Sequence, residues 1–192
     1  MSVSFLDTLY ELGTNPSLSS NVELARLAPL HRILLTSDGT LTKLLEVYLL
    51  EDIEIVKLVE EQIELPRDVL PLEVKAGEKV TRRTVTLQGK QTLRHWLYAE
   101  SIIVPERLEA NFNRDLVQQA HIPIGKLWLQ HRMEVFKQLM LITRETAGEL
   151  AGYFNIQETD NVLGRSYCVY SGQRPVMIIT DRFPESYFVK PI

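Results

Sequence analysis

Residues 165–183 read RSYCVYSGQRPVMIITDRF and carry the strongest structural signal in the chain. Apolar and polar side chains alternate over residues 165–170 and again over residues 175–183, a pattern typical of β-strands. The four residues between them, SGQR, favour a tight hairpin turn. The stretch therefore predicts two neighbouring antiparallel strands.

The chain before this hairpin contains further strand patterns. Residues 80–87 and 93–104 predict a second hairpin around a turn at 88–90, and residues 53–65 alternate like another strand. Residues 132–143 fit either a strand or a helix, and we favour a strand because two strands follow. Hairpins without a regular strand–helix–strand rhythm indicate an α+β fold with one mostly antiparallel sheet.

Helices are predicted between these strands from apolar residues spaced three and four apart and from residues that favour helix starts. They cover residues 20–27, residues 41–51, the segment from Pro105 to before Pro123, and residues 124–131. No repeat or linker divides the chain. We therefore expect one domain over residues 31–192, preceded by a helical extension over residues 1–30.

The composition argues against several classes of protein. The 192 residues carry a net charge of -4, which disfavours binding to nucleic acid. The lone cysteine, Cys168, cannot form an internal disulfide, and we expect a buried, inert thiol. No apolar run approaches the roughly 18 residues that span a bilayer. A basic leader followed by an apolar core is also missing, so we expect a cytoplasmic protein without stable membrane insertion.

Known cofactor motifs are not found in the sequence. It contains neither GxGxxG nor a phosphate-binding GxxxxGK[ST] loop, and no GxSxG motif of a hydrolase. The four histidines do not follow a metal-ligand spacing; they are His31, His95, His121 and His131. Dinucleotide and P-loop sites therefore lack support, and we expect no metal site.

Arg83 is the first candidate for a binding residue. In the strand pattern VTRRTVTL, residues 80–87, alternation places Arg82 and Arg83 on opposite faces. Arg83 shares the more apolar face with Val85 and Leu87. A guanidinium there needs an anionic partner, and its planar fork suits a carboxylate. The partner is either a ligand or a structural Glu or Asp.

Three more charges interrupt apolar strands. Asp181 alternates with Met177 and Ile179, so it faces inward or caps the strand end. Arg165 either reaches a second anion or lies exposed at the strand edge. Glu100 is either a partner for Arg83 or faces solvent. Together these charges could bind a small polyanion in a sheet-lined cavity.

Four segments then occur in an order typical of a known family. They are LLTSDGTLT (34–42), RTVTL (83–87), IPIGKL (122–127) and GRSY (164–167) continuing through PVMIITDRFP (175–184). Together they resemble the chorismate lyase family, whose wider relatives include the UTRA ligand-sensing domain of transcription regulators. The likeness covers about residues 30 to 185.

The resemblance implies a highly curved, mostly antiparallel sheet of about six strands, with helical flaps over an enclosed ligand cavity. It also implies conversion of chorismate to 4-hydroxybenzoate and pyruvate without a cofactor, feeding a quinone branch (plastoquinone or ubiquinone). A second hypothesis is a non-catalytic sensor or binding domain for an aromatic carboxylate on the same fold.

The resemblance also implies roles for individual residues. Arg83 would hold the ring carboxylate, assisted by the backbone N–H of Ile124. Asp181 would bind the ring hydroxyl beside the backbone of Leu41, and Arg165 is a weaker candidate for the enolpyruvyl carboxylate. The family usually has Glu at the position of Asp181, so the carboxylate here could be retracted by roughly one C–C bond, about 1.5 Å.

Overall fold

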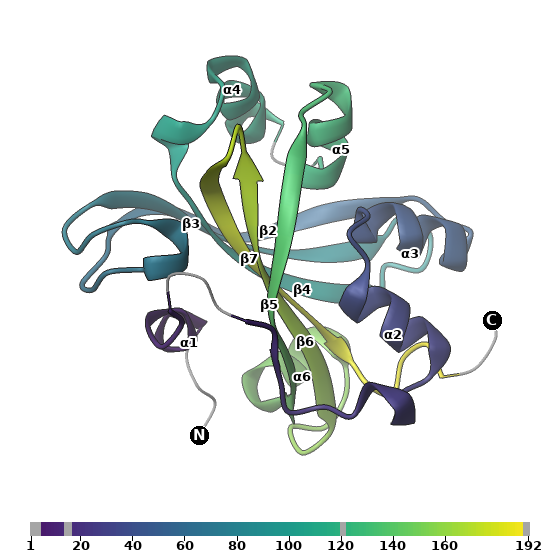
Figure 1. Cartoon of the computed structure of the whole chain (residues 1–192). Helices are drawn as coiled ribbons and strands as arrows, with labels where there is room; N and C mark the ends of the chain where they lie inside the picture. Colours follow the sequence, from purple (N-terminus) through teal and green to yellow (C-terminus); the bar gives the residue numbers. More distant parts are fainter. Residues whose placement is uncertain (1–4, 14–16, 120–121, 190–192) are drawn as a thin grey trace.

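The computed structural model describes residues 5–13, 17–119 and 122–189. One residue named above, His121, lies outside these ranges. The described chain forms one sheet with helices packed around it, an α+β fold as predicted (Figure 1). None of its helices is long and apolar enough to cross a bilayer.

The described residues form a sheet of seven strands in the order β1-β5-β6-β7-β4-β3-β2. Every neighbouring pair is antiparallel except β1 and β5. The seventh strand, beyond the six or so expected, is the two-residue β1. The strands are β1 (Ser19–Ser20), β2 (Ile53–Glu64), β3 (Lys79–Gly89), β4 (His95–Ile103), β5 (Val135–Thr146), β6 (Asn161–Ser171) and β7 (Arg174–Pro184).

Both predicted hairpins are confirmed. Strands β6 and β7 pair across the turn at residues 171–174, and β3 and β4 pair across residues 89–95. The ambiguous stretch at residues 132–143 contains most of β5, because the edge of β6 provides eleven residues that pair with it. The high curvature implied by the resemblance stays a prediction.

Six α-helices occur in the described chain. They are α1 (Phe5–Tyr10), α2 (Pro29–Thr36), α3 (Leu41–Leu49), α4 (Ala110–Gln118), α5 (Ile124–Gln130) and α6 (Ala151–Phe154). The predicted helices at residues 41–51 and 124–131 are confirmed as α3 and α5. Helices α1, α2 and α6 were not predicted.

Two helix predictions are wrong in part. In place of a helix at residues 20–27, the chain makes β1 and one 3-10 turn at Leu24–Arg26, because the backbone at Ser19 and Ser20 pairs with the edge of β5. The helix predicted from Pro105 begins only at Ala110. A 3-10 turn precedes it, anchored where Arg107 donates to the carbonyl oxygens of Leu72, Glu73 and Pro175 at 2.6–2.8 Å.

The apolar core divides into three clusters around the sheet. One lies under α2 and α3 and includes Leu35, Leu45 and Phe183. A second joins α1 to the β2–β3 connection, and Cys168 is buried in it as expected. The third lies under α4 and α5. Successive side chains of β7 point to opposite faces of the sheet, so Ile178 packs in the second cluster and Met177 in the third.

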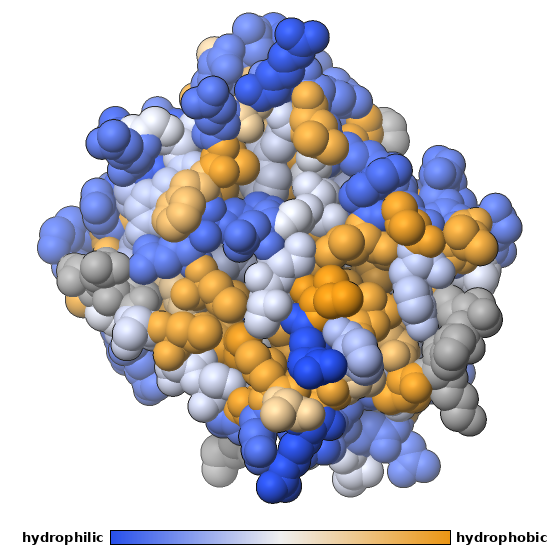
Figure 2. All heavy atoms as spheres, turned by 45° about the vertical axis from the view of Figure 1, so that its right-hand side comes forward, coloured by the Kyte–Doolittle hydropathy of each residue, from blue (hydrophilic) through white to orange (hydrophobic). Residues whose placement is uncertain are grey.

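The side of the molecule that carries α2 and α3 also exposes apolar side chains. Figure 2 brings this side forward and shows apolar groups gathered between polar ones. Ile33 of α2 and Val47 of α3 are about half exposed or more, and Leu50, which caps α3, is 86% exposed. Apolar side chains gathered on one face of a protein often mark a contact surface.

Candidate active site

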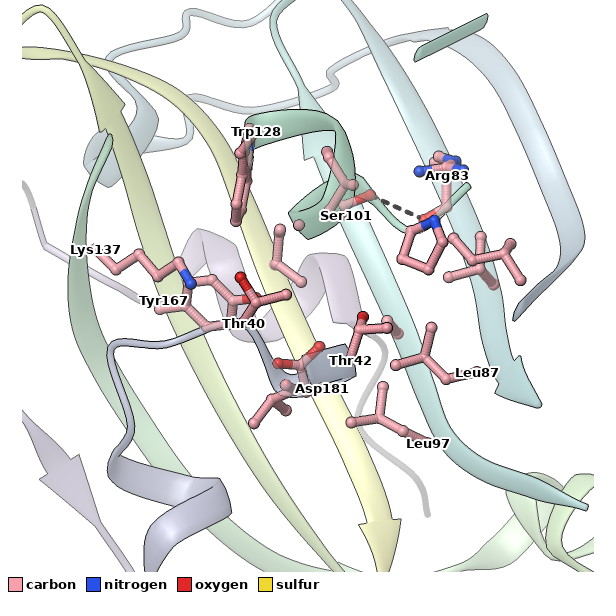
Figure 3. Close-up of a pocket in the computed structure, with 18 residues that line it drawn as sticks. Thr40, Thr42, Arg83, Leu87, Leu97, Ser101, Trp128, Lys137, Tyr167 and Asp181 are labelled. Carbon is pink, nitrogen blue, oxygen red and sulfur yellow. Dashed lines mark hydrogen bonds between the residues drawn. The ribbon is translucent and has the colours of Figure 1, made fainter. Parts of the chain in front are cut away.

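A cavity lies between one face of the sheet and the N-termini of α3 and α5 (Figure 3). It contains about 580 Å³ of space between protein atoms, part of it open to solvent. Its wall is mostly apolar and includes Ile55, Val85, Leu87, Leu97, Ala99, Trp128 and Ile179.

Arg83 lines this cavity from the middle of β3. Val85 and Leu87 line it too, so the face predicted by alternation is confirmed. Only 3% of Arg83 is exposed, and its Nε lies 3.3 Å from Oε2 of Glu60, the paired residue on β2. Burial lowers the pKa of the Arg83 guanidinium, and the nearby Glu60 partly offsets this effect. Arg83 thus has a structural carboxylate partner and also borders the cavity.

The N-terminal ends of two helices lie close together on the other side of the cavity. Leu41 and Ile124, the first residues of α3 and α5, both line it. The first N–H groups of a helix have no acceptor within the helix, so they can serve a ligand. A Cβ atom at Gly125 would overlap the methyl group of Thr40. Glycine is therefore what allows α5 to approach the start of α3.

Asp181 lines the same cavity from β7, so it faces inward. Its Oδ2 accepts a hydrogen bond from Nε of Arg165 at 3.1 Å, and both side chains are almost fully buried. Arg165 also donates to the Ser37 carbonyl at 2.8 Å and lies 4.8 Å from the centre of the Tyr167 ring.

The structure excludes one of the two sequence alternatives for Arg165, the exposed strand edge, while its contact with a ligand anion stays a prediction. It is 2% exposed, so it is not an exposed strand-edge charge. It does not line the main cavity but a smaller neighbouring one, with Ser37, Lys137 and Tyr167. Arg165 thus supports Asp181 from behind the cavity wall.

Glu100 also differs from its prediction. It neither pairs with Arg83 nor faces solvent: it is buried on the opposite face of the sheet, where Oε2 accepts from Nη1 of Arg182 at 2.9 Å. Oε1 lies 3.6 Å from Arg82. The reason is alternation, since Glu100 is one residue out of phase with the cavity-lining Ala99 and Ser101.

Lys137 is a cavity residue that the sequence interpretation missed. It lies on β5, and its Nζ donates to the carbonyl oxygens of Asp38 and Gly39 at 3.0 Å. Burial, together with the nearby Arg165, lowers the pKa of Lys137 to about 8. The sequence signal was present, because Lys137 alternates with Val135 and Leu139 just as Arg83 alternates with Val85.

Tyr167 of β6 borders the cavity between Lys137 and Asp181. Burial, with the Asp181 carboxylate beside it, raises the pKa of the phenol. In the described residues, no three His, Cys, Asp or Glu side chains are grouped so as to hold a metal ion. The polar groups at the cavity are therefore cations, a carboxylate, hydroxyls and helix N–H groups, which suit a small anionic ligand with a hydroxyl.

Comparison with known proteins gives one consistent result from sequence. The family model described as Chorismate pyruvate-lyase Rv2949c-like matches residues 35–188. The chorismate pyruvate-lyase of Mycobacterium tuberculosis (strain H37Rv) is 30% identical over 181 residues, covering 88% of this chain and 86% of that protein. The Mycobacterium leprae protein of the same name is 28% identical, covering 91% and 83%.

Solved structures add a likeness of fold. The effector domain of PhnF from Mycobacterium smegmatis matches with a TM-score of 0.59 at 9% identity, covering 76% of this chain and 88% of that domain. A GntR-family transcriptional regulator from Bacillus cereus matches with a TM-score of 0.54 at 8% identity, covering 73% and 97%. At such low identity the likeness concerns the fold alone.

Proposed function

The chain belongs to the Rv2949c-like chorismate pyruvate-lyase family, and we propose that it converts chorismate to 4-hydroxybenzoate and pyruvate. One observation carries the proposal: Arg83 and Asp181 line the same cavity on one face of the sheet. Strand β4 lies between β3 and β7. Arg83 pairs with Ser101 of β4 and Asp181 with Ala99, so the two positions are also offset by two residues along the strands. With strands about 4.8 Å apart and a rise of about 3.4 Å per residue, the two backbone positions lie about 12 Å apart. Their side chains can therefore hold opposite ends of one six-membered ring.

Arg83 binds the ring carboxylate of chorismate in this proposal, with the N–H of Ile124 as a second donor. The ring hydroxyl, on the opposite ring carbon, donates to Asp181 beside the backbone of Leu41. Opposite charges and donors at the two ends fix one orientation of the ring, and the apolar wall between them excludes water. Retraction of the shorter Asp181 side chain does not remove it from the cavity, which it lines.

The reaction itself needs little from the protein beyond positioning. The hydrogen on the hydroxyl-bearing carbon leaves as a proton, and its electron pair forms the last double bond of the aromatic ring. The neighbouring carbon–oxygen bond breaks, and its electrons leave with the enolpyruvyl oxygen. The enolpyruvate takes up a proton at its methylene carbon to become pyruvate. We propose further that this takes place in the cytoplasm and that 4-hydroxybenzoate feeds a quinone branch.

The Arg165–Asp181 ion pair favours one second candidate, a non-catalytic domain that binds an aromatic carboxylate. Asp181 already accepts a hydrogen bond from the buried Arg165, so in such a domain it would anchor a ligand hydroxyl and do nothing more.

One experiment separates these candidates. The purified chain is incubated with chorismate, and 4-hydroxybenzoate and pyruvate are followed over time against heat-denatured protein. The lyase proposal expects both products in equal amounts above the spontaneous rate. Tight binding of 4-hydroxybenzoate without turnover would support the binding domain, and neither binding nor turnover would overturn both.

A further inference from the structure

The cavity holds a second cation whose position is unlike that of Arg83. Lys137 reaches it from β5, while Arg83 reaches it from β3, and β6, β7 and β4 lie between them. In Figure 3 the Lys137 ammonium points into the cavity toward Tyr167 and Thr40, and Arg83 lies on the far side of the cavity. Asp181 is close enough to raise the pKa of Lys137. The cavity is therefore positive at two separate places.

Chorismate carries two carboxylates, and its covalent structure restricts where the second one lies. The enolpyruvyl ether is attached to the ring carbon next to the one that bears the hydroxyl. If Asp181 binds the hydroxyl, the enolpyruvyl carboxylate lies near the Asp181 end of the cavity. A carboxylate buried there needs a cation, because an unpaired buried charge is costly.

Lys137 fits this requirement better than Arg165 does. Arg165 is used by Asp181 and by the Ser37 carbonyl, and it does not line the main cavity. Lys137 does line it. An ammonium has three N–H donors, and two of those of Lys137 go to Asp38 and Gly39. Its Nζ also lies 5.0 Å from the centre of the Trp128 ring and 5.8 Å from that of Tyr167, two residues of the cavity wall, so a third donor can reach a ligand in the cavity.

From this geometry we infer that Lys137 binds the enolpyruvyl carboxylate of chorismate and is a specificity-determining residue. The inference rests on the proposed lyase function. It makes Lys137 the group that distinguishes substrate from product, because 4-hydroxybenzoate keeps the groups that face Arg83 and Asp181 but lacks the enolpyruvyl group.

A purely structural role for Lys137 has to be separated from this one. The same side chain holds the segment before α3, where Asp38 and Gly39 precede the cavity residues Thr40 and Leu41. Loss of a structural contact there would disturb the shared part of the cavity. It would weaken the binding of chorismate and of 4-hydroxybenzoate alike, whereas loss of a substrate contact would weaken the binding of chorismate alone.

The experiment compares three variants with the wild type. Lys137→Met removes the charge, Lys137→Arg keeps it, and Lys90→Met removes an exposed lysine that pairs with Asp52 away from the cavity. The KM for chorismate is measured by turnover, and the dissociation constant of 4-hydroxybenzoate by calorimetry. For Lys137→Met we expect KM to rise about 10- to 100-fold, which corresponds to the loss of one hydrogen bond to a charged group. The affinity for 4-hydroxybenzoate should change less than threefold, and Lys137→Arg should recover part of the loss.

A second measurement is the pH profile of the wild type, with Lys137→Arg as its control. The groups that face Lys137 are Arg165 and Tyr167 of β6, Asp181 of β7 and Asp38 before α3. The pKa of Lys137 is about 8, so the free enzyme loses this positive charge as pH rises through that value. We expect kcat/KM for chorismate to fall above pH 8 in the wild type, because kcat/KM reports groups of the free enzyme. The fall should disappear in Lys137→Arg, since arginine stays charged.

The possible results are distinguishable. An unchanged KM in Lys137→Met, an equal loss of both ligands, or a flat wild-type profile to pH 9.5 would each overturn the inference while leaving the lyase function intact. A wild type that does not turn over chorismate would overturn the proposed function and this inference with it.

Discussion

At the residue scale, Arg83 lies between two possible anions. Glu60 is its partner on the β2 side, 3.3 Å away and 18% exposed, and the cavity lies on the other side. Arginine has five N–H donors in a fixed fork, so one guanidinium can serve a structural carboxylate and a ligand carboxylate together. The two roles can therefore be tested apart.

We predict that Arg83→Ala lowers kcat/KM for chorismate by about 100-fold or more, because it removes a charge-assisted and potentially bidentate contact. Glu60→Gln keeps the side-chain volume, and Glu60 lies outside the cavity. This substitution should therefore lower kcat/KM for chorismate by less than about fivefold. Steady-state kinetics on both variants, with thermal unfolding as the folding control, makes the comparison. Equal losses in the two would mean that Arg83 acts only through its ion pair.

At the element scale, a buried carboxylate stabilises the turn between β3 and β4 by accepting hydrogen bonds from it. Glu51 lies beyond the end of α3 and accepts hydrogen bonds from the N–H groups of Gln91 and Thr92 at 3.1 Å, the Thr92 hydroxyl at 2.9 Å and the Trp96 indole at 3.3 Å. Burial by itself would raise the pKa of Glu51, but these hydrogen bonds outweigh burial and hold it below its usual value. The ionised form is the one that stabilises the turn.

Glu51→Gln should therefore lower the free energy of unfolding by about 1.5–3 kcal/mol at neutral pH. Because the pKa of Glu51 is lower in the folded than in the unfolded protein, its ionised form stabilises the fold at pH values above the unfolded-state pKa. This stabilisation is lost as the pH falls through the folded-state pKa. The difference in the free energy of unfolding between wild type and variant should thus be largest above about pH 4.5 and become smaller in more acidic solution. Urea unfolding at several pH values measures it, with the exposed Glu64→Gln as control. A pH-independent difference would contradict the prediction.

The approach of α3 and α5 depends on one missing side chain. A Cβ at Gly125 would overlap the Thr40 methyl, whereas a Cβ at Gly152 in α6 would meet open space. We predict that Gly125→Ala costs about 1–3 kcal/mol of stability through overpacking. It should also raise the KM for chorismate, because it separates two helix ends that line the cavity.

The matched control is Gly152→Ala, which should be neutral or slightly stabilising because alanine favours a helix. The double variant Thr40→Ala with Gly125→Ala removes the overlap and should recover part of the lost stability. Calorimetry and chorismate kinetics on all three variants provide the readouts. A Gly125→Ala protein indistinguishable from the wild type would show that the helix ends have room to spare.

At the scale of the whole molecule, the N-terminal segment packs against the sheet and also pairs with one of its strands. Phe5 and Leu9 of α1 are almost fully buried in the cluster that contains Cys168 and Ile178, and β1 pairs with β5. The boundary at residue 31 stays a prediction. The packing predicts how the segment contributes to stability.

Leu9→Ala should reduce the free energy of unfolding by about 2–5 kcal/mol, the usual result of emptying a buried leucine site. Leu18→Ala, at a half-exposed position of the same segment, should change it by less than about 0.5 kcal/mol. Both are measured by urea denaturation. A silent Leu9→Ala variant would mean that α1 is not part of the folded core.

The sequence alone determined the two hairpins, helices α3 and α5, and the face to which Arg83 points. These follow from alternation, apolar spacing and turn residues, which act between near neighbours in the chain. The tertiary structure alone decided that Glu60 pairs with Arg83, Arg165 with Asp181 and Glu100 with Arg182. It also placed Lys137 in the cavity and β1 on the sheet. Such contacts depend on the order and register of strands far apart in sequence, which local patterns do not encode.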